Sequence, residues 1–317
     1  PDPIEDTLLK FGLGPFGLAY RPANDSWIDP KNQLEAIAAG RLELLVDAPN
    51  PFLVAPRRYW LAARLLAENG LEATAECLEA AIQALPTVGD RLPQAAPARR
   101  EVSRILDSPH PASGLAFLRE SGVGSLLFPG TKATNEERIA HLPKLPALRW
   151  AAWLRGSATA RVLVRFRAPH DFARRVERIQ AHHPIERVVD AAREHGIRKI
   201  MQRLAPDEIA ALLAWRRLEL AASRNPAEAQ EIEAHLVSIE MRIAEARATE
   251  SRASRIRALA LDGEAVMEAL DAGPGRHVGQ ALTHLAHFVE GRPELNERTA
   301  LEAELLDWAR KNTSLLD

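Results

Sequence analysis

Residues 161–203 carry the basic side chains most able to hold phosphate groups. This window contains eleven Lys or Arg residues and five Asp or Glu residues. A local surplus of positive charge on helices is typical of a surface that contacts nucleic-acid phosphates. A solvated helical surface can have the same composition, so both interpretations stay open at this point. The candidate contacts within the window are Arg174, Arg175, Arg178, Arg198 and Lys199.

A second candidate for phosphate binding is the turn at residues 274–279, which reads Pro-Gly-Arg-His-Val-Gly. Pro-Gly favours a turn, and we expect the next helix to begin near Arg276. The free backbone N–H groups at a helix start, beside Arg276 and His277, can receive a phosphate. The competing interpretation is a plain turn between two helices that carries exposed charges.

Catalytic and metal-binding patterns are weak. Transfer of a nucleotide needs paired carboxylates on a strand to hold two metal ions, and a Gly-rich turn for the triphosphate. The sequence has no Asp-x-Asp pair in a predicted strand, and Gly12-Leu-Gly14 is too short for a phosphate loop. The pair His182-His183, with His195, is more typical of exposed histidines at helix ends than of a metal site. We therefore predict no catalytic residue, metal ligand or cofactor for this chain alone.

The composition is that of a helical protein. Of the 317 residues, 46% are hydrophobic and 26% are charged, and the formal net charge of −2 gives no overall sign of a nucleic-acid partner. The single cysteine, Cys77, lies on the apolar side of a helical pattern, which predicts a buried thiol. No secretory signal opens the sequence, and no apolar run approaches the roughly 20 residues of a membrane span. We expect a cytoplasmic protein without a membrane partner.

Turn residues and apolar spacing divide the chain into helices that follow a short β region. A polar turn at residues 22–25 between two short strand-like segments predicts a hairpin. From residue 56 onward the apolar spacing is helical, and Gly70 and Pro86 are expected to end helices. The longest predicted helix spans residues 226–252.

Several short motifs then occur in a specific order. Residues 108–129 contain Pro-x-x-Gly-Leu, Leu-x-Glu-x-Gly and Leu-Leu-x-Pro. Three further motifs near the C-terminus involve Gly263, Val266, Met267, Pro274, Gly275, Val278, Gly279 and Asn296. Together they resemble the neck-to-body passage and the tail of CCA-adding enzymes (tRNA nucleotidyltransferases) and bacterial poly(A) polymerases. Ala265 and Arg276 depart from the family pattern, which has Asp and Pro there.

The N-terminal residues resemble the same family at its active site, but nearly every residue with a chemical role is replaced. Ile28-Asp29-Pro30 and Pro51 match the family pattern. The positions of the palm strand and of the nucleotide-reading edge are occupied by Gly12, Phe16, Asn50, Leu53, Pro56 and Tyr59. The resemblance implies a degenerate active site without a recognisable catalytic head. Mg²⁺ and a nucleotide would enter only if a head is supplied elsewhere.

The resemblance implies a mostly α-helical fold with a small N-terminal β-hairpin left from a nucleotidyltransferase palm. It also implies four segments, which are a palm remnant (1–47), an RNA-binding helical neck (48–130), a helical body (131–252) and a tail (253–317). The predicted function is binding of tRNA-like RNA without nucleotidyltransferase activity. One alternative is an active transferase or poly(A) polymerase whose head lies upstream or on another chain. The other is a structural subunit that binds proteins in a larger assembly.

Overall fold

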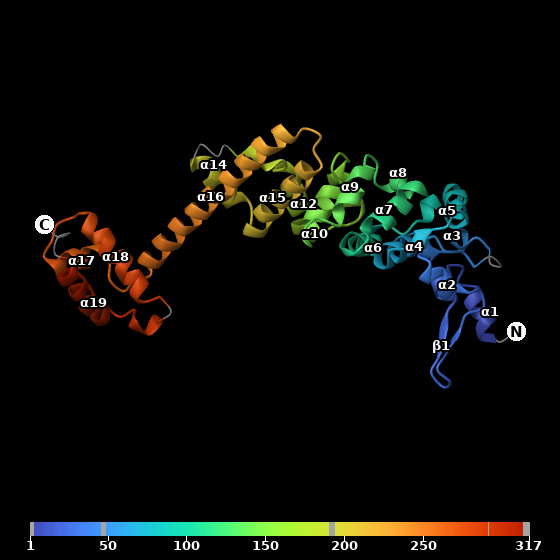
Figure 1. Cartoon of the computed structure of the whole chain (residues 1–317), viewed down its shortest axis with the longest axis horizontal. Coiled ribbons are helices and arrows are strands. Elements are labelled where there is room, and N and C mark those ends of the chain that lie inside the picture. The colour runs from blue at the N-terminus through green and yellow to red at the C-terminus, as the bar shows by residue number, and fades with distance from the viewer. Residues whose placement is uncertain (1–2, 46–48, 190–193, 291, 313–317) are drawn as a thin grey trace. The chain divides into compact units, whose positions relative to one another are not determined.

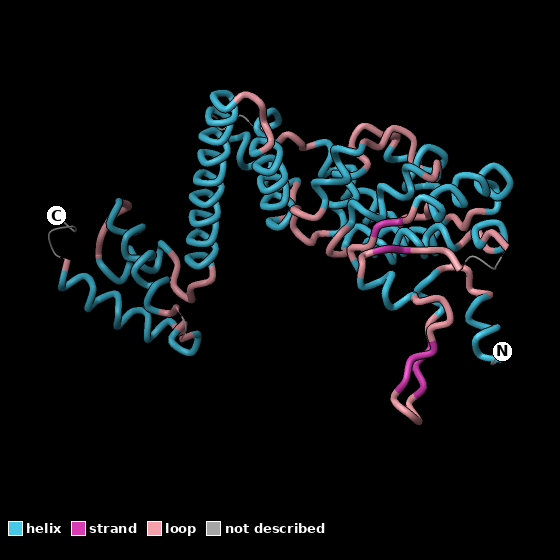
Figure 2. Tube along the Cα trace, turned by 45° about the vertical axis from the view of Figure 1, so that its right-hand side comes forward, coloured by secondary structure: helices cyan, strands magenta, loops and turns pink. Residues whose placement is uncertain are grey.

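The computed structural model describes residues 3–45, 49–189, 194–290 and 292–312 (Figure 1). Within these ranges nearly all elements are helices, and the strands form two short pairs, drawn in magenta in Figure 2. The predicted mostly α-helical fold is confirmed. Contacts group the chain into unit 1 (Pro1–Val188 and Gln202–Glu233) and unit 2 (Val189–Met201 and Ala234–Asp317). The finer division into four segments stays a prediction.

The β region is a hairpin, as the polar turn predicts. Strands β1 (Ala19–Arg21) and β2 (Ser26–Ile28) pair antiparallel, with Tyr20 opposite Trp27. The two exposed rings lie 5.3 Å apart between centroids. The second pair is parallel and joins β3 (Arg41–Leu42) to β4 (Glu72–Ala73). It therefore connects the N-terminal residues to the helices that follow.

Unit 1 is a series of short helices. They are α1 (Pro3–Leu9), α2 (Gln33–Ala38), α3 (Pro51–Val54), α4 (Arg58–Asn69), α5 (Ala75–Val88), α6 (Ala95–Asp107), α7 (Pro111–Glu120), α8 (Val123–Leu127), α9 (Ala133–Ile139), α10 (Pro146–Trp153), α11 (Thr159–Arg165), α12 (His170–Ala181), α13 (Ile185–Val188) and α15 (Pro206–Ala221). Gly70 ends α4 in the left-handed conformation, as expected. Pro86 does not end α5, so that prediction is wrong. The helix continues because Ala84 and Val88 stay buried on either side of the proline.

The core of unit 1 is rich in aromatic side chains. Phe128 stacks on Phe166 with ring centroids 4.9 Å apart, and Trp153 lies 4.5 Å from Phe128. Trp60 meets both phenylalanines edge-on. Such tilted and edge-on contacts are favourable for aromatic rings and contribute beyond the area that they bury. Cys77 is also buried, as predicted, and burial raises the pKa of its thiol to about 12.

A buried arginine joins α6 to α10. Arg149 is 2% exposed, and its guanidinium donates to the carbonyl oxygens of Leu106 at 2.5 Å, Leu142 at 2.9 Å and Pro143 at 3.3 Å. Burial lowers the pKa of Arg149, partly offset by the nearby charge of Asp107. The guanidinium thereby bonds three backbone carbonyl groups, of which that of Pro143 also accepts from Leu145 N–H at 2.7 Å.

Unit 2 has its own small core. Its helices are most of α14 (Glu194–Arg203), most of α16 (Pro226–Arg257), α17 (Gly263–Leu270), α18 (Arg276–Phe288) and α19 (Arg298–Lys311). The long helix begins at the predicted residue and ends five residues later than expected. Buried side chains at the centre of α17, α18 and α19 are Leu261, Val266, Ala281, Leu285, Leu301 and Leu305. Asn296 fixes the loop before α19, because its side chain bonds the backbone of Ala258 and Ala260.

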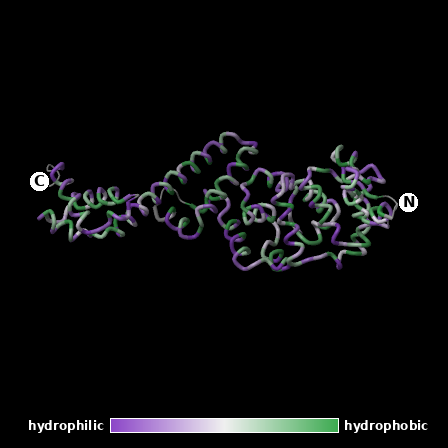
Figure 3. Tube along the Cα trace, turned by 90° about the horizontal axis from the view of Figure 1, so that it is seen from below, coloured by the Kyte–Doolittle hydropathy of each residue, from purple (hydrophilic) through white to green (hydrophobic). Residues whose placement is uncertain are grey.

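None of the helices in the described ranges is long and apolar enough to cross a membrane. Figure 3 shows hydrophilic residues interrupting hydrophobic ones along the helices of both units.

Two glycines with positive φ allow the cost of backbone strain to be distinguished from the cost of overpacking when each is replaced by alanine. Gly12 and Gly40 have φ of 78° and 74°. A Cβ on Gly12 would lie 2.6 Å from Cβ of Pro51, whereas a Cβ on Gly40 would meet nothing within 4 Å. We expect Gly40→Ala to lower the free energy of unfolding by about 1–2 kcal/mol, the cost of a left-handed alanine. Gly12→Ala should cost about 1–3 kcal/mol more, through overpacking. Urea denaturation measures both, and equal losses would contradict this assignment.

Candidate nucleic-acid interface

Two of the predicted arginines on α12 bind a buried carboxylate. Glu208, near the start of α15, has a fully buried side chain. Arg175 Nε lies 2.8 Å from Glu208 Oε1, and Arg178 Nη2 lies 2.6 Å from the same oxygen. Arg175 also pairs with Asp207. The other oxygen of Glu208 accepts a hydrogen bond from the backbone N–H of Ala205 at 3.0 Å, which caps the first turn of α15.

These contacts make Arg175 and Arg178 part of the fold. Burial alone would raise the pKa of Glu208, but hydrogen bonds from Arg178 and Ala205 N–H, with the two arginine charges, hold it below its usual value. The side chains of Arg175 and Arg178 are each about one third exposed. The charge that these arginines present to a phosphate is reduced, because Asp207 and Glu208 lie just beyond the window that predicted a surplus.

The remaining predicted cations lie on two helices. Arg174 is exposed on α12 in unit 1. Arg198 and Lys199 are exposed on α14 in unit 2. Arg198 lines a small groove of about 190 Å³ together with Arg242, Glu245 and neighbouring residues of α16. The predicted site residues are therefore divided between the two units.

Unit 2 contains a polar groove around the start of α18, called the tail groove below. Its volume is about 750 Å³, and its lining is Arg252, Arg276, Gly279, Gln280, Thr283, Trp308 and Asn312. Arg276 was predicted as a phosphate ligand, and the fold brings Arg252 of α16 and Trp308 of α19 beside the same groove. No carboxylate lines it, and within the described residues neither guanidinium forms an ion pair.

His277 does not line the tail groove. Its Nε2 lies 3.0 Å from the carbonyl oxygen of Gly273, so the ring closes the turn before α18. Gly275 is extended, and a Cβ there would lie 2.5 Å from Cε1 of His277. The helix begins at Arg276, as predicted. Of the predicted pair, only Arg276 therefore reaches the groove, while its neighbour supports the turn.

The tail groove combines the groups that RNA recognition uses. Two unpaired guanidiniums can contact phosphates, and Trp308 offers an aromatic surface next to amide and hydroxyl groups. Gly279 leaves open space on the groove side of α18, since a Cβ there would meet nothing within 4 Å. Sequence reasoning missed Arg252 and Trp308 because they come from separate helices and match no local motif.

Two neck residues that the resemblance placed at a nucleotide-reading edge, Asn50 and Tyr59, bond the backbone of the fold. Asn50 caps α3, since its Oδ1 accepts from Phe52 N–H at 3.0 Å and its Nδ2 donates to Ala80 O at 2.8 Å. The buried Tyr59 hydroxyl donates to Ala81 O at 2.5 Å, and burial raises the pKa of Tyr59 to about 12. Asn50 and Tyr59 therefore fasten α3 and α4 to α5.

The prediction of exposed histidines is wrong for His182 and His183. The His183 ring is buried, stacks on Trp215 at 3.7 Å between centroids, and places Nε2 3.0 Å from Glu219. His182 Nδ1 lies 2.7 Å from the carbonyl oxygen of Arg178. A partner aromatic on α15, which is distant in sequence, explains the burial. The side chain of His195 lies outside the described residues. Within the described chain, no group of three His, Cys, Asp or Glu residues is arranged to hold a metal ion.

Short helices follow a β-hairpin in unit 1, and three helices share a small core near the C-terminal end of unit 2. No model of a protein family matches the sequence, and no curated protein matches it either. Solved CCA-adding enzymes share the fold. The Bacillus stearothermophilus enzyme in complex with CTP has a TM-score of 0.56 and 19% identity over 98% of this chain and 76% of its own.

Two further structures give the same result. The Thermotoga maritima CCA-adding enzyme complexed with tRNA has a TM-score of 0.56 and 14% identity, over 96% of this chain and 73% of its own. A CCA-adding enzyme in an apo form has a TM-score of 0.57 and 12% identity, over 96% and 72%. The likeness therefore extends over most of the chain, and at these identities it is a likeness of fold.

Neighbouring arginines of α12 should respond differently to charge reversal. Arg175→Glu places a carboxylate against Glu208 and should lower the free energy of unfolding by about 2 kcal/mol, less than for a fully buried pair because Arg175 is partly exposed. Arg174→Glu should change it by less than about 0.5 kcal/mol. Urea denaturation compares the two variants.

The effect of Arg175→Glu should depend on pH. The pKa of Glu208 is lower in the folded chain than the ordinary value of a glutamate carboxyl, because Arg178, Arg175 and the Ala205 N–H stabilise its charge. Its stabilising charge is therefore present above that value and is lost as pH falls through the folded pKa. The difference between wild type and Arg175→Glu should shrink in acid. A difference that is constant with pH would contradict the ion pair.

Proposed function

We propose that the chain binds tRNA-like RNA in the cytoplasm through unit 2, and that it does not transfer nucleotides on its own. The observation that carries the proposal is the tail groove. The guanidiniums of Arg252 and Arg276 are suited to binding phosphate groups, and the indole of Trp308 is suited to contact with a base or a ribose. Arg198 and Lys199 on α14 add positive charge to the same unit.

The absence of acid from the tail groove distinguishes it from the other basic helices. On α12, Arg175 and Arg178 are largely neutralised by Asp207 and Glu208. In the tail groove, a phosphate would be the first anion that Arg252 or Arg276 meets within the described residues. A structured RNA supplies phosphates on a surface of defined shape, which helical proteins recognise without reading its sequence. The fold shared with a CCA-adding enzyme complexed with tRNA supports a tRNA-like ligand.

The proposal that activity is lost rests on the neck. Leu53 has no hydrogen-bonding group to offer a base, and Asn50 and Tyr59 use theirs within the fold. An Arg replaced by Leu loses both its charge and its bidentate donors. The fold shared with an enzyme that binds CTP favours a second candidate, a transferase completed by a head from elsewhere.

Charge reversal in the tail groove should weaken RNA binding without harming the fold. We expect Arg252→Glu combined with Arg276→Glu to raise the Kd for a tRNA transcript by about 10- to 100-fold. The slope of log K against log salt should fall by about 2, since roughly two phosphate contacts are removed. Thermal stability should hold, because both side chains are exposed and unpaired in the described structure.

The matched control is Arg247→Glu combined with Arg310→Glu, two exposed positions on α16 and α19 outside the groove lining, which should leave the Kd within about twofold.

Gly279→Glu adds an independent test. It should also weaken binding while keeping or raising stability, because glycine is unfavourable in a helix and an added Cβ meets no atom within 4 Å. Gly279→Ala should stabilise the helix and leave binding intact. Normal RNA binding by both Glu variants would refute the groove as the RNA site.

The isolated chain should add no nucleotide to RNA. We expect a tRNA transcript that ends before CCA, with Mg²⁺, CTP and ATP, to be extended no more than in a reaction without protein. The reason is the replacement of the nucleotide-reading groups at Leu53, Asn50 and Tyr59. An active CCA-adding enzyme provides the positive control on the same transcript. Incorporation by this chain above the blank would show that the transferase reading is right.

A further inference from the structure

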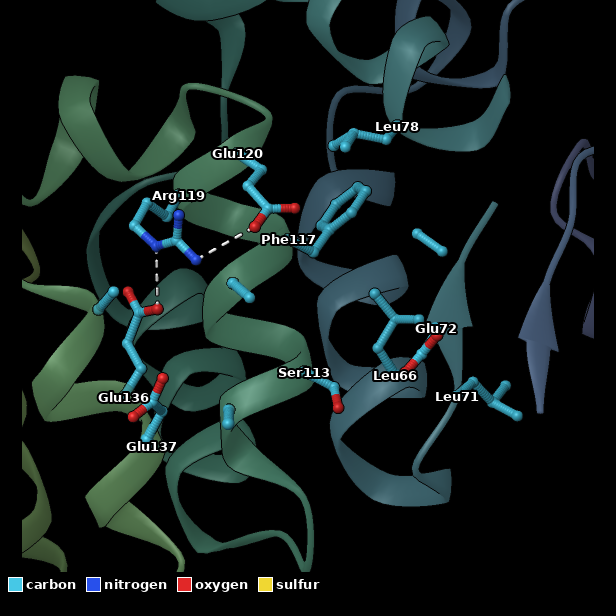
Figure 4. A pocket seen from close by; sticks show the side chains of 14 residues that line it. Leu66, Leu71, Glu72, Leu78, Ser113, Phe117, Arg119, Glu120, Glu136 and Glu137 are labelled. Atoms are coloured by element: carbon cyan, nitrogen blue, oxygen red, sulfur yellow. Dashed lines mark hydrogen bonds and ion pairs between the residues drawn. The ribbon is translucent and has the colours of Figure 1, made fainter. Parts of the chain in front are cut away.

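Unit 1 contains an apolar hollow with acidic edges, called the acidic groove below. Its volume is about 420 Å³. It lies between the end of α4, β4 and α5 on one side and α7 and α9 on the other (Figure 4). Its lining is Leu66, Leu71, Glu72, Ala73, Leu78, Ala112, Ser113, Ala116, Phe117, Arg119, Glu120, Ala133, Glu136 and Glu137.

The hollow exists because α7 presents small side chains to it. Ala112, Ser113 and Ala116 fall on one face of the helix, where their short side chains leave the space between the neighbouring elements open. Leu66 and Phe117, both buried, form part of the apolar lining. An open apolar hollow of this kind suits a large aliphatic or aromatic side chain from another molecule.

The edges of the acidic groove carry more negative than positive charge. Its one cation, Arg119, is already bound, since Nε lies 3.1 Å from Glu136 Oε2 and Nη2 lies 3.1 Å from Glu120 Oε1. Glu72 and Glu137 are exposed, and within the described residues neither forms an ion pair. Figure 4 shows Glu72 and Glu137 on opposite sides of the hollow.

Glu136 keeps the edge of the acidic groove negative, because it binds the cation of the lining, Arg119. Its side chain, on α9, is 4% exposed and forms an ion pair with Arg119 of α7. Burial raises the pKa of Glu136, and the hydrogen bond and charge of Arg119 oppose that rise. Arg119 is thereby committed to Glu136 and Glu120, which leaves Glu72 and Glu137 without a cation in the described structure.

We propose that the acidic groove binds a basic amphipathic segment of a protein partner. An apolar side chain of that segment fills the hollow, and Lys or Arg residues beside it pair with Glu72 and Glu137. A helix that carries an apolar stripe flanked by basic residues has this chemistry. RNA is the wrong partner for this surface, because its phosphates would meet four carboxylates and one guanidinium that is already paired. The inference does not depend on the proposed RNA binding, which uses residues of unit 2.

The test uses three fluorescent synthetic helices and the full chain. The first peptide has a Leu stripe flanked by Lys, the second has Glu in place of Lys, and the third has Ser in place of Leu. Fluorescence anisotropy should show binding of the first at about 100 μM or below, the range of weak transient contacts. The second and third should bind at least about tenfold more weakly. Failure of the first peptide to bind, or equal binding of the second or third, would overturn the proposal.

Two variants of the chain localise the binding. Glu72→Gln with Glu137→Gln should weaken the first peptide about tenfold, and Ala116→Leu, which fills the hollow, should do the same. The matched control, Glu35→Gln with Asp90→Asn, removes the same charge from exposed, unpaired positions outside the groove and should change nothing. Equal weakening by the control would mean non-specific attraction and would overturn the proposal.

Two other occupants are distinguished by the same variants. Sedimentation shows whether the chain self-associates, and a dimer that Ala116→Leu dissociates would mean that a second copy fills the groove. A tRNA transcript shows whether RNA uses this surface, and weaker RNA binding by Glu72→Gln with Glu137→Gln would point to RNA. Either result would overturn the proposal. Unchanged tRNA binding by these variants supports it, whether or not the tail groove binds RNA.

Discussion

Burial of the Arg149 guanidinium is the interaction on which the arrangement of unit 1 depends. It donates to carbonyl oxygens at the end of α6 and in the loop before α10, and no carboxylate of the described residues bonds it directly. Arginine keeps its charge even when buried, so removal of these acceptors would leave a desolvated cation. The same contacts set the position of α10, which sends Trp150 and Trp153 into the core. Helix α12 is attached in turn, because Gln180 donates to Ala151 O at 2.8 Å.

Several other arginines of unit 1 also bind groups of the protein itself. Arg64 pairs with Glu101, Arg119 with Glu136, and Arg216 with Glu186, each joining two different helices. Charge counted along the sequence therefore overstates the positive surface, because the compensating carboxylate lies on another helix. A cation is available to an outside anion only where the fold supplies no acid, as in the tail groove. This distinction, more than the number of arginines, separates a binding surface from a structural ion pair.

Local signals in the sequence were sufficient for much of the fold. The glycine after α4, the turn before α18 and the apolar spacing of α16 each predicted a boundary or a helix that the structure contains. The prediction that Pro86 ends the helix was wrong because Ala84 and Val88, on either side of it, are buried and α5 continues to Val88. His183 misled because its stacking partner, Trp215, is remote in sequence. The site was less predictable for the same reason. Arg276 belongs to a local motif, whereas its groove partners arrive from other helices through tertiary packing.

The two grooves have opposite chemistry, and each is built by a different use of small residues. In the acidic groove, the small side chains of Ala112 and Ala116 leave a hollow on α7 beside apolar side chains. In the proposed complex, burial of an apolar side chain provides the attraction, and the carboxylates favour a segment with basic residues beside that side chain. In the tail groove, Gly279 opens α18 beside guanidiniums and amides, so a close approach of a phosphate backbone is permitted. The RNA proposed for the tail groove and the protein segment proposed for the acidic groove therefore call for opposite charges and contact different residues of the chain.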